Sequence, residues 1–308
     1  MLRRALLAAS ASPRLRQLIM TAPQTRAIVD SYVAGETADD AVRVTRTLRA
    51  AGLLVTLDYL GEDTKDPAQA EAVTDEYVGL LGKLGAEGLT HGGAAEVSVK
   101  ATAVGLFLGT GIAAGNIARI CAAAEHAGTT VTLDAEEYQT IEPTQRIAAE
   151  LRADHGQLGT VVQACLRRSE ADCRSLAAAG VRVRLCKCAY SEPDSVAFTA
   201  RRDVDLSYAR CLRVLMNGPG YPMAATHDPR LIEITGALGL LAGRAADSFE
   251  YQMLYGIRPA EQRRLANTGA RMRVYVPYGG DWYSYLVRRL AERPRNLAFF
   301  LRSLRSKG

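Results

Sequence analysis

Charged and polar side chains that could form a binding site recur at the ends of short apolar runs in this sequence. Lys100, Asp134, Gln163, Arg184 and Lys187 lie at or near the ends of four β-branched runs that follow one another along the chain. Because cations predominate among them, such a group suits an anionic ligand or a cofactor whose reduced form is an anion. A buried ion-pair network that only stabilises the fold is the alternative, since buried charges occur mainly in pairs.

A second group of candidate binding residues lies near the C-terminus. Tyr285, Arg288, Arg289 and Glu292 have the i, i+3, i+4 and i+7 spacing that places side chains on one face of a helix. Two neighbouring guanidinium groups can bind one carboxylate, and a glutamate can orient one of them. Spacing alone favours the simpler alternative, a basic helix end in solvent, because further arginines follow.

The other reactive residue types lack the spacing of metal or acyl-transfer sites. The four histidines form neither an HxH nor an HxxxH pattern, and the six cysteines include no CxxC pair, so we expect no metal site. There is no GxSxG motif and no convincing Cys–His pair, which argues against acyl transfer. We expect the cysteines to be free thiols in a reducing compartment. His227 follows a predicted strand end beside Thr226, where it could contact a ligand.

Eight strand–helix units would position these side chains. The β-branched runs predict strands at 53–58, 96–100, 129–134, 160–165, 181–186, 222–226, 248–252 and 272–276. Helical periodicity between and after them is clearest at 68–84, 113–127, 143–153, 169–179, 194–216, 228–241, 259–267 and 281–292. Glycines at 52, 128, 159 and 180 precede four of the strands, where we expect them to end helices. These units predict a (β/α)8 TIM-like barrel over residues 46–308, preceded by a helical segment over residues 1–45.

Apolar and polar side chains alternate within several of the predicted strands. Val97 and Val99 alternate with Ser98 and Lys100, and residues 131–134, 181–185 and 273–276 show the same pattern. Alternate side chains of a strand share a face. The apolar face should pack against the helices, so we expect the polar face to line the barrel interior, which in most such barrels is apolar.

Few features of the remaining sequence suggest other classes of protein. Gly109, Gly111 and Gly115 have GxGxxxG spacing, for which we expect a loop over the second strand end rather than a dinucleotide-binding turn. No apolar stretch is long enough for a transmembrane helix. Residues 1–29 contain five arginines and no acid, and residues 288–308 contain seven basic residues and one acid. Solvated helix faces explain these ends more simply than lipid or nucleic-acid binding, and we expect no nucleic acid as a partner.

Eight segments together resemble the proline dehydrogenase family and follow that family's order. They are VSVK (97–100), LDAEEY (133–138), VVQACLRRS (161–169), VRLCKCAY (183–190), ATHD (225–228), FEYQMLYG (249–256), RVYVPYG (273–279) and YLVRRLAERPRN (285–296). The resemblance implies a distorted βα barrel with FAD at its C-terminal face. It also implies oxidation of L-proline to 1-pyrroline-5-carboxylate, with electrons passed to a membrane quinone.

The resemblance implies roles for individual residues on the substrate side. Lys100, Arg288 and Arg289 would bind the proline carboxylate, while Tyr275 and Leu254 would pack against the pyrrolidine ring. Tyr285 would belong to this side, behind the residues that touch the substrate.

It also implies catalytic and cofactor-binding residues. Asp134 would support Lys100 or Tyr275, and Arg184 would stabilise reduced flavin. The implied FAD contacts are Ala135, Gln163, Arg184, Lys187, Cys188, Ala189, Thr226 and His227. The family usually has glycine where this chain has Cys188, which adds a side chain at a close backbone approach.

The resemblance further predicts the enzyme's partners and location. Because the chain ends soon after Asn296, we expect a separate dehydrogenase to consume the pyrroline-5-carboxylate. We expect a cytoplasmic protein, with peripheral association at the inner membrane surface as a further hypothesis. Three alternatives stay open: a hydroxyproline dehydrogenase of the same family, a barrel enzyme for phosphorylated anionic substrates, and a non-catalytic module that binds membranes or nucleic acid through its basic ends.

Overall fold

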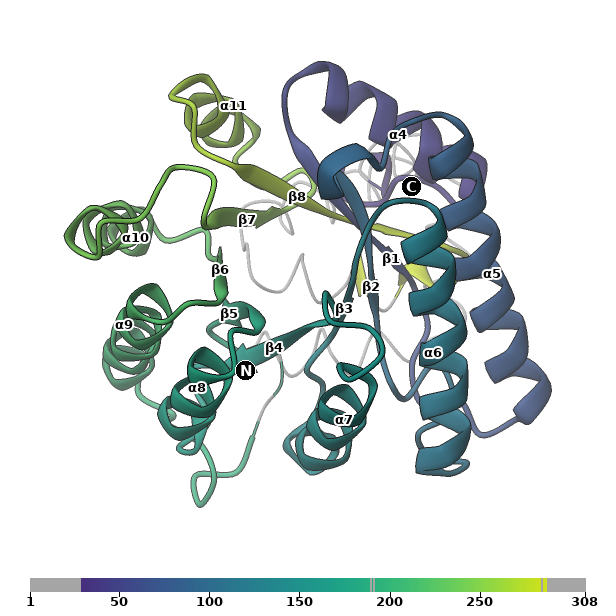
Figure 1. The fold of residues 1–308 in the computed structure, drawn as a ribbon, viewed down its shortest axis with the longest axis horizontal. Coiled ribbons are helices and arrows are strands. Elements are labelled where there is room, and N and C mark those ends of the chain that lie inside the picture. The colour runs from purple at the N-terminus through teal and green to yellow at the C-terminus, as the bar shows by residue number, and fades with distance from the viewer. Residues whose placement is uncertain (1–28, 189, 191, 284, 287–308) are drawn as a thin grey trace, which may run out of the picture.

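The strands form one closed parallel barrel in a computed structural model of the chain (Figure 1). The structure describes residues 29–188, 190, 192–283, 285 and 286. Each strand pairs with the next along the chain, and β8 closes the barrel against β1 with Val55 opposite Val274. The predicted (β/α)8 barrel is therefore confirmed.

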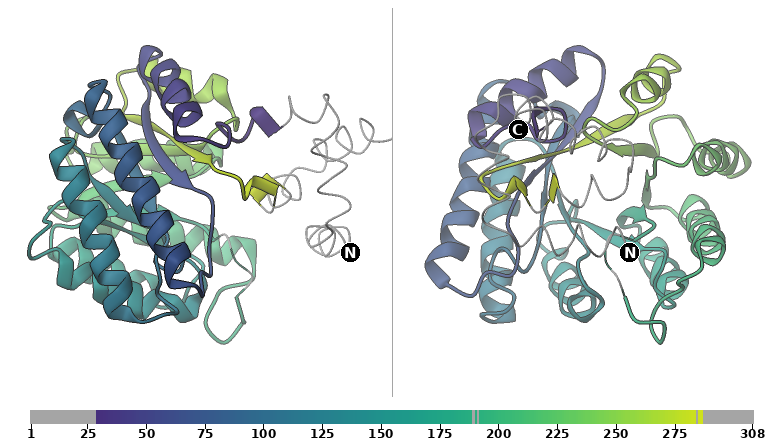
Figure 2. Two further views of the ribbon diagram at one scale, coloured as in Figure 1. Left: turned by 90° about the vertical axis from the view of Figure 1, so that its right-hand side faces the viewer. Right: turned by 180° about the vertical axis from the view of Figure 1, so that it is seen from behind.

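The strands alternate with helices that form an outer layer (Figures 1 and 2). The strands are β1 (Leu54–Tyr59), β2 (Ala95–Val99), β3 (Val131–Leu133), β4 (Gly159–Gln163), β5 (Arg182–Cys186), β6 (Tyr221–Ala225), β7 (Glu250–Leu254) and β8 (Met272–Tyr278). The helices are α4 (Ala38–Ala50), α5 (Pro67–Ala86), η1 (His91–Gly93), α6 (Thr110–His126), α7 (Tyr138–Leu151), α8 (Ser169–Ala178), α9 (Arg201–Asn217), α10 (Pro229–Leu241) and α11 (Pro259–Asn267). Within the described ranges no helix is both long and apolar enough to span a bilayer.

Three of the four predicted helix-ending glycines have that role. Gly52, Gly128 and Gly180 have φ of 75°, 70° and 68°, a conformation that favours glycine. The amide after each glycine bonds back to a helix carbonyl, as Thr129 N does to the oxygen of Ala124 at 2.8 Å. The fourth prediction is wrong, because Gly159 begins β4 and belongs to the sheet.

Two helices begin five or more residues away from their predicted starts. The predicted helix over 194–216 begins only at Arg201, because Ala197 forms a backbone bridge with Leu166 instead of a helical turn. Helix α7 begins at Tyr138 and contains Pro143, at which the sequence predicted its start. The GxGxxxG segment is only in part a loop. Its first glycine precedes α6, and the other two lie within that helix.

The helix before the barrel packs on β1 and β8. Thr37 and Asp40 cap the start of α4 through reciprocal bonds between side chain and backbone. The buried side chains of α4 belong to the same apolar cluster as the outward faces of β1, β2 and β8. The predicted boundary at residue 45 falls inside this helix, and residues 1–28 lie outside the described part of the chain.

Charged residues fill the barrel interior at the N-terminal ends of the strands, as the alternation predicts. Arg273 donates to Glu250 at 2.6 Å and to the backbone oxygen of Val55 at 2.9 Å. Arg182 donates to Glu96 at 2.7 Å, and Glu96 is 0 % exposed. Burial disfavours ionisation of Glu96, but the arginines around it outweigh this effect and hold its pKa below the ordinary value. The charges thus neutralise one another inside the barrel.

One buried carboxyl group links two loops at the opposite end of the barrel. Glu136, between β3 and α7, accepts hydrogen bonds from the backbone amide and the hydroxyl of Thr102, between β2 and α6. Burial raises the pKa of Glu136 to about 7, although its bonds to Thr102 oppose the shift. We therefore expect this side chain to change its protonation state near neutral pH.

Removing one partner from the interior network should destabilise the fold. We expect Arg273→Met to lower the free energy of unfolding by about 3–5 kcal/mol, because Glu250 would remain buried without its main cation. Urea unfolding followed by circular dichroism measures the change. The exposed pair Arg264–Glu261 provides the control, and Arg264→Met should cost less than about 1 kcal/mol. Equal effects of the two variants would contradict this account.

Glu136 should make stability depend on pH. Its folded pKa lies above its unfolded value, so the folded protein binds more protons between about pH 4.5 and pH 7. The free energy of unfolding should therefore fall by up to about 3 kcal/mol as pH rises through this window. Urea unfolding at pH 5 and pH 8 should show Glu136→Gln gaining stability relative to the unmodified protein at pH 8. Glu142→Gln, which changes an exposed glutamate, should show no such gain. If Glu136→Gln changed the free energy of unfolding equally at both pH values, the raised pKa of Glu136 would be refuted.

Candidate active site

A cavity of about 580 Å³ opens at the C-terminal ends of the strands. In (β/α)8 barrels this is the end at which active sites lie. The cavity wall includes these residues predicted from the sequence: Lys100, Asp134, Ala135, Gln163, Arg184, Lys187, Cys188, Thr226, His227, Leu254, Tyr275 and Tyr285. Their collection in one cavity follows from closure of the barrel, which brings all strand ends to one rim.

Lys100 pairs with a carboxylate that the sequence analysis did not select. Its Nζ lies 2.5 Å from Oδ1 of Asp58, and both residues line the cavity. Burial works against the charged ammonium, but Asp58 and then Asp134 outweigh it and raise the pKa of Lys100. Lys100 therefore presents a positive charge in a site that is largely shielded from water.

The position of Asp58 could have been found from the sequence. It ends the strand predicted at 53–58 and continues, after Thr56, the polar alternation seen in the other strands. Its ion pair with Lys100 depends on the tertiary structure. Strands β1 and β2 pair with Asp58 opposite Ser98, two residues before Lys100.

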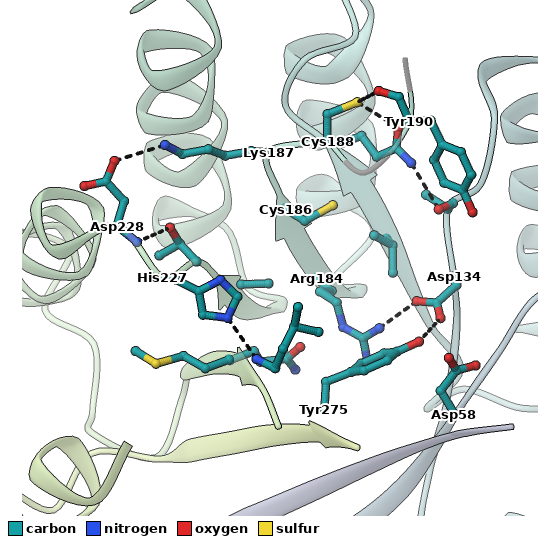
Figure 3. Close-up of a pocket in the computed structure, with 18 of the residues that line it drawn as sticks. Asp58, Asp134, Arg184, Cys186, Lys187, Cys188, Tyr190, His227, Asp228 and Tyr275 are labelled. Atoms are coloured by element: carbon teal, nitrogen blue, oxygen red, sulfur yellow. Dashed lines mark hydrogen bonds and ion pairs between the residues drawn. The ribbon is translucent and has the colours of Figure 1, made fainter. Parts of the chain in front are cut away.

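Asp134 connects an arginine and a tyrosine across the barrel (Figure 3). Arg184 Nη1 donates to Oδ1 of Asp134 at 2.7 Å, and the Tyr275 hydroxyl donates to Oδ2 at 2.7 Å. The guanidinium carbon of Arg184 lies 5.1 Å from the centre of the Tyr275 ring. Of the two possible partners expected for Asp134, Tyr275 makes the hydrogen bond, while Lys100 bonds to Asp58.

Arg184 has hydrogen-bonding capacity that the described residues do not use. Its Nε is buried and has no hydrogen-bond acceptor among them. A buried donor without a partner costs about 1–3 kcal/mol. Because Arg184 lines the cavity, a ligand acceptor there would remove this cost.

Lys187 lies in an ion-pair cluster on one wall of the cavity, and Figure 3 shows its contact with Asp228. Its Nζ is 2.5 Å from Asp205 and 3.0 Å from Asp228, and Arg230 contacts the same two carboxylates. Asp228 also caps the start of α10. These bonds fix a cation beside the space where β5 and β6 end.

Contacts with the backbone hold the side chains of two other predicted residues in the wall. Gln163 donates through Nε2 to the carbonyl oxygens of Ala135 and Glu136 at 3.0 Å each. His227 Nε2 accepts a hydrogen bond from the amide of Leu254 at 3.0 Å. The rim of the cavity is therefore joined by bonds between neighbouring strand ends.

The cysteines depart from the expectation of free thiols. Cys165, after β4, and Cys188, after β5, form a disulfide with their Cα atoms 5.6 Å apart. Parallel pairing of β4 with β5 brings these two residues together although 23 positions separate them. Cys121, Cys173, Cys186 and Cys211 are free thiols.

Part of the predicted site cannot be placed. Ala189, Arg288 and Arg289 lie outside the described residues, as does Glu292, so the expected carboxylate clamp is not described. The wall also contains residues that were not predicted, among them Leu60, Cys186 and Gln252. No cluster of three or more metal-binding side chains occurs within the described ranges.

Comparison with known protein sequences gives consistent matches over most of the chain. The family model described as "Proline dehydrogenase" matches residues 41–302. "Proline dehydrogenase 1" of Bacillus subtilis is 38% identical over 283 residues, which cover 92% of each chain. "Proline dehydrogenase" of Deinococcus radiodurans is 36% identical over 309 residues, 98% of this chain and 97% of the relative.

A solved structure shows the same fold. The crystal structure of proline utilization A from Bdellovibrio bacteriovorus inactivated by N-propargylglycine matches with a TM-score of 0.80 and 25% identity. The match covers 87% of this chain and 33% of that chain, so this protein spans about a third of the longer relative. The family match, the two sequence relatives and the barrel lead to one conclusion: the chain belongs to the proline dehydrogenase family.

Proposed function

We propose that the protein oxidises L-proline to 1-pyrroline-5-carboxylate with FAD as its cofactor. The observation that carries this proposal is the meeting of Lys100, Arg184 and Tyr275 in one cavity at the C-terminal ends of the strands. The family membership and the names of the relatives support the same activity.

Lys100 is suited to bind the proline carboxylate. An ammonium group has three donors, and Asp58 occupies one of them in the structure. Lys100 can therefore donate to a substrate carboxylate without losing Asp58. Because the site is buried, such a charge-assisted hydrogen bond would be stronger than one in water. Arg288 and Arg289 stay sequence predictions for the same clamp.

Asp134 and Tyr275 would shape the substrate side of the cavity. The hydrogen bond from Tyr275 to Asp134 fixes the tyrosine ring, which could then pack against the pyrrolidine ring with Leu254. Rigid positioning of this kind converts binding energy into the alignment of reacting atoms.

The residues of the cavity fit a flavin. The buried Nε of Arg184 has no acceptor among the described residues, and the acceptor atoms of a flavin ring would supply one. Lys187, Gln163, Thr226 and His227 line the same cavity and offer further polar contacts. Bound FAD would accept the two electrons removed from proline. Arg184 would stabilise the negative charge of the reduced cofactor.

The later steps are also proposals. Electrons would leave the flavin for a membrane quinone, and a separate dehydrogenase would oxidise the open-chain form of the product. We propose a cytoplasmic location with peripheral contact at the inner membrane surface.

The activity can be tested by the colour of the protein. Purified protein should carry flavin absorbance that L-proline bleaches without oxygen, because the flavin accepts both electrons. A water-soluble quinone should restore the absorbance. Titration with trans-4-hydroxy-L-proline in parallel distinguishes the hydroxyproline alternative. Protein that binds no flavin, even when FAD is added, would refute the proposal.

Loss of the charge on Lys100 should weaken substrate binding selectively. Lys100→Met should raise KM for proline about 10- to 100-fold, the equivalent of one hydrogen bond to a charged group. Flavin content should persist, because the residues proposed to contact the cofactor are other residues of the cavity wall. Steady-state kinetics and the ratio of flavin to protein measure the two effects. Lys83→Met, which changes an exposed lysine on α5, should leave both unchanged. Loss of flavin at unchanged KM would assign Lys100 to the cofactor instead.

A further inference from the structure

We propose that the Cys165–Cys188 pair is a reversible redox modification site in the cavity wall, and that its state controls how tightly the cavity holds flavin. The inference rests on the proposed function, because it takes flavin as the ligand of the cavity. The disulfide joins two loops and takes no part in the proposed reaction.

The disulfide joins two segments that already meet through their backbones. The amide of Cys165 donates to the carbonyl oxygen of Lys187 at 2.9 Å, and the amide of Phe198 donates to the oxygen of Cys165 at 2.7 Å. Leu166 and Ala197 form a backbone bridge beside them. Both ends of the loop after β5 are thus held against the segment that follows β4. The disulfide attaches this loop covalently near its first residue.

This attachment point belongs to the proposed cofactor site. Cys188 lines the cavity next to Lys187, whose ammonium is fixed by Asp205 and Asp228. A covalent link at Cys188 restricts the loop conformations that would move Lys187. Breaking the link should therefore loosen the cavity wall and weaken flavin binding.

The surroundings of the pair can accommodate both redox states. Cys165 is 3% exposed within a small apolar cluster with Ile141 and Ala197. Cys188 is partly exposed, and its Sγ lies 3.3 Å from the backbone oxygen of Tyr190 and 3.8 Å from Oε1 of Gln163. A thiol is a weak donor, so the reduced Cys188 would find acceptors in place. Access from the cavity makes Cys188 the sulfur that a reductant would attack.

The exchange balances with a dithiol as the reductant. One thiolate of the dithiol attacks Sγ of Cys188, the disulfide breaks, and Cys165 leaves as a thiolate that takes a proton. The second thiol of the dithiol then displaces Cys188 and closes its own disulfide, leaving Cys188 protonated. Two electrons pass from the dithiol to the protein pair. A small-molecule disulfide such as oxidised glutathione reverses the reaction.

Thermodynamic linkage makes the control reciprocal. If reduction lowers flavin affinity by a given factor, bound flavin must favour the disulfide by the same factor. Bound flavin should also slow reduction, because it would cover Cys188 from the cavity side.

The test uses the flavin-loaded protein, purified without thiol reagents and divided into untreated and dithiothreitol-treated samples. Alkylation after denaturation, followed by peptide mass measurement, identifies the paired cysteines. Fluorescence of released FAD gives the Kd. We expect Cys165 and Cys188 to escape alkylation until dithiothreitol is added, and the Kd for FAD to rise about tenfold on reduction.

Two variants separate this role from general effects of cysteine loss. Cys165→Ala should show the weaker Kd with and without dithiothreitol. Cys121→Ala changes an equally buried cysteine on α6, and it should respond to the reductant like the unmodified protein.

Three outcomes would overturn the inference. The pair could be alkylated even after treatment with oxidised glutathione, or the Kd could be the same in the oxidised, reduced and Cys165→Ala forms. Flavin could also be absent from every form, which would overturn the proposed function and the control of flavin together. The alkylation pattern distinguishes this last case, since it reports on the disulfide without any flavin.

Discussion

The charged groups buried inside the barrel must neutralise one another, and this requirement governs how its residues are arranged. Burying an ion without a partner costs several kcal/mol, and this barrel buries many. At the N-terminal ends of the strands the buried charges form ion pairs with one another, as Arg273 does with Glu250 and Arg182 with Glu96. These ion pairs stabilise the N-terminal end of the barrel. The cavity lies at the opposite end, where the strands have their C-termini.

At the C-terminal ends the same kind of pairing leaves capacity for a ligand. Lys100 uses one of its three donors on Asp58, and Arg184 keeps a buried Nε without an acceptor among the described residues. Both cations line the cavity, where an anionic substrate and a reduced cofactor would need positive charge.

The loops over the cavity are fixed by bonds that differ in chemistry. The Glu136 link to Thr102 involves a group that titrates near neutral pH, whereas the Cys165–Cys188 link is covalent. Hydrogen bonds and disulfides respond to different conditions, namely proton and thiol concentrations. The rim can thus be rigid under one condition and looser under another, while the strands beneath remain unchanged.

The barrel and its polar interior were predictable from the sequence, because strand periodicity is a local property that repeats in eight units and the alternation of apolar and polar side chains recurs in four of them. Position at strand ends and the family resemblance together selected about half of the residues that line the cavity. The partner of each side chain, in contrast, depends on the tertiary structure. Asp58 rather than Asp134 holds Lys100, and Cys165 bonds to Cys188, because these partners come from neighbouring strands whose register no local pattern encodes. Long-range contacts depend on closure of the whole barrel, and closure is a property of the folded chain.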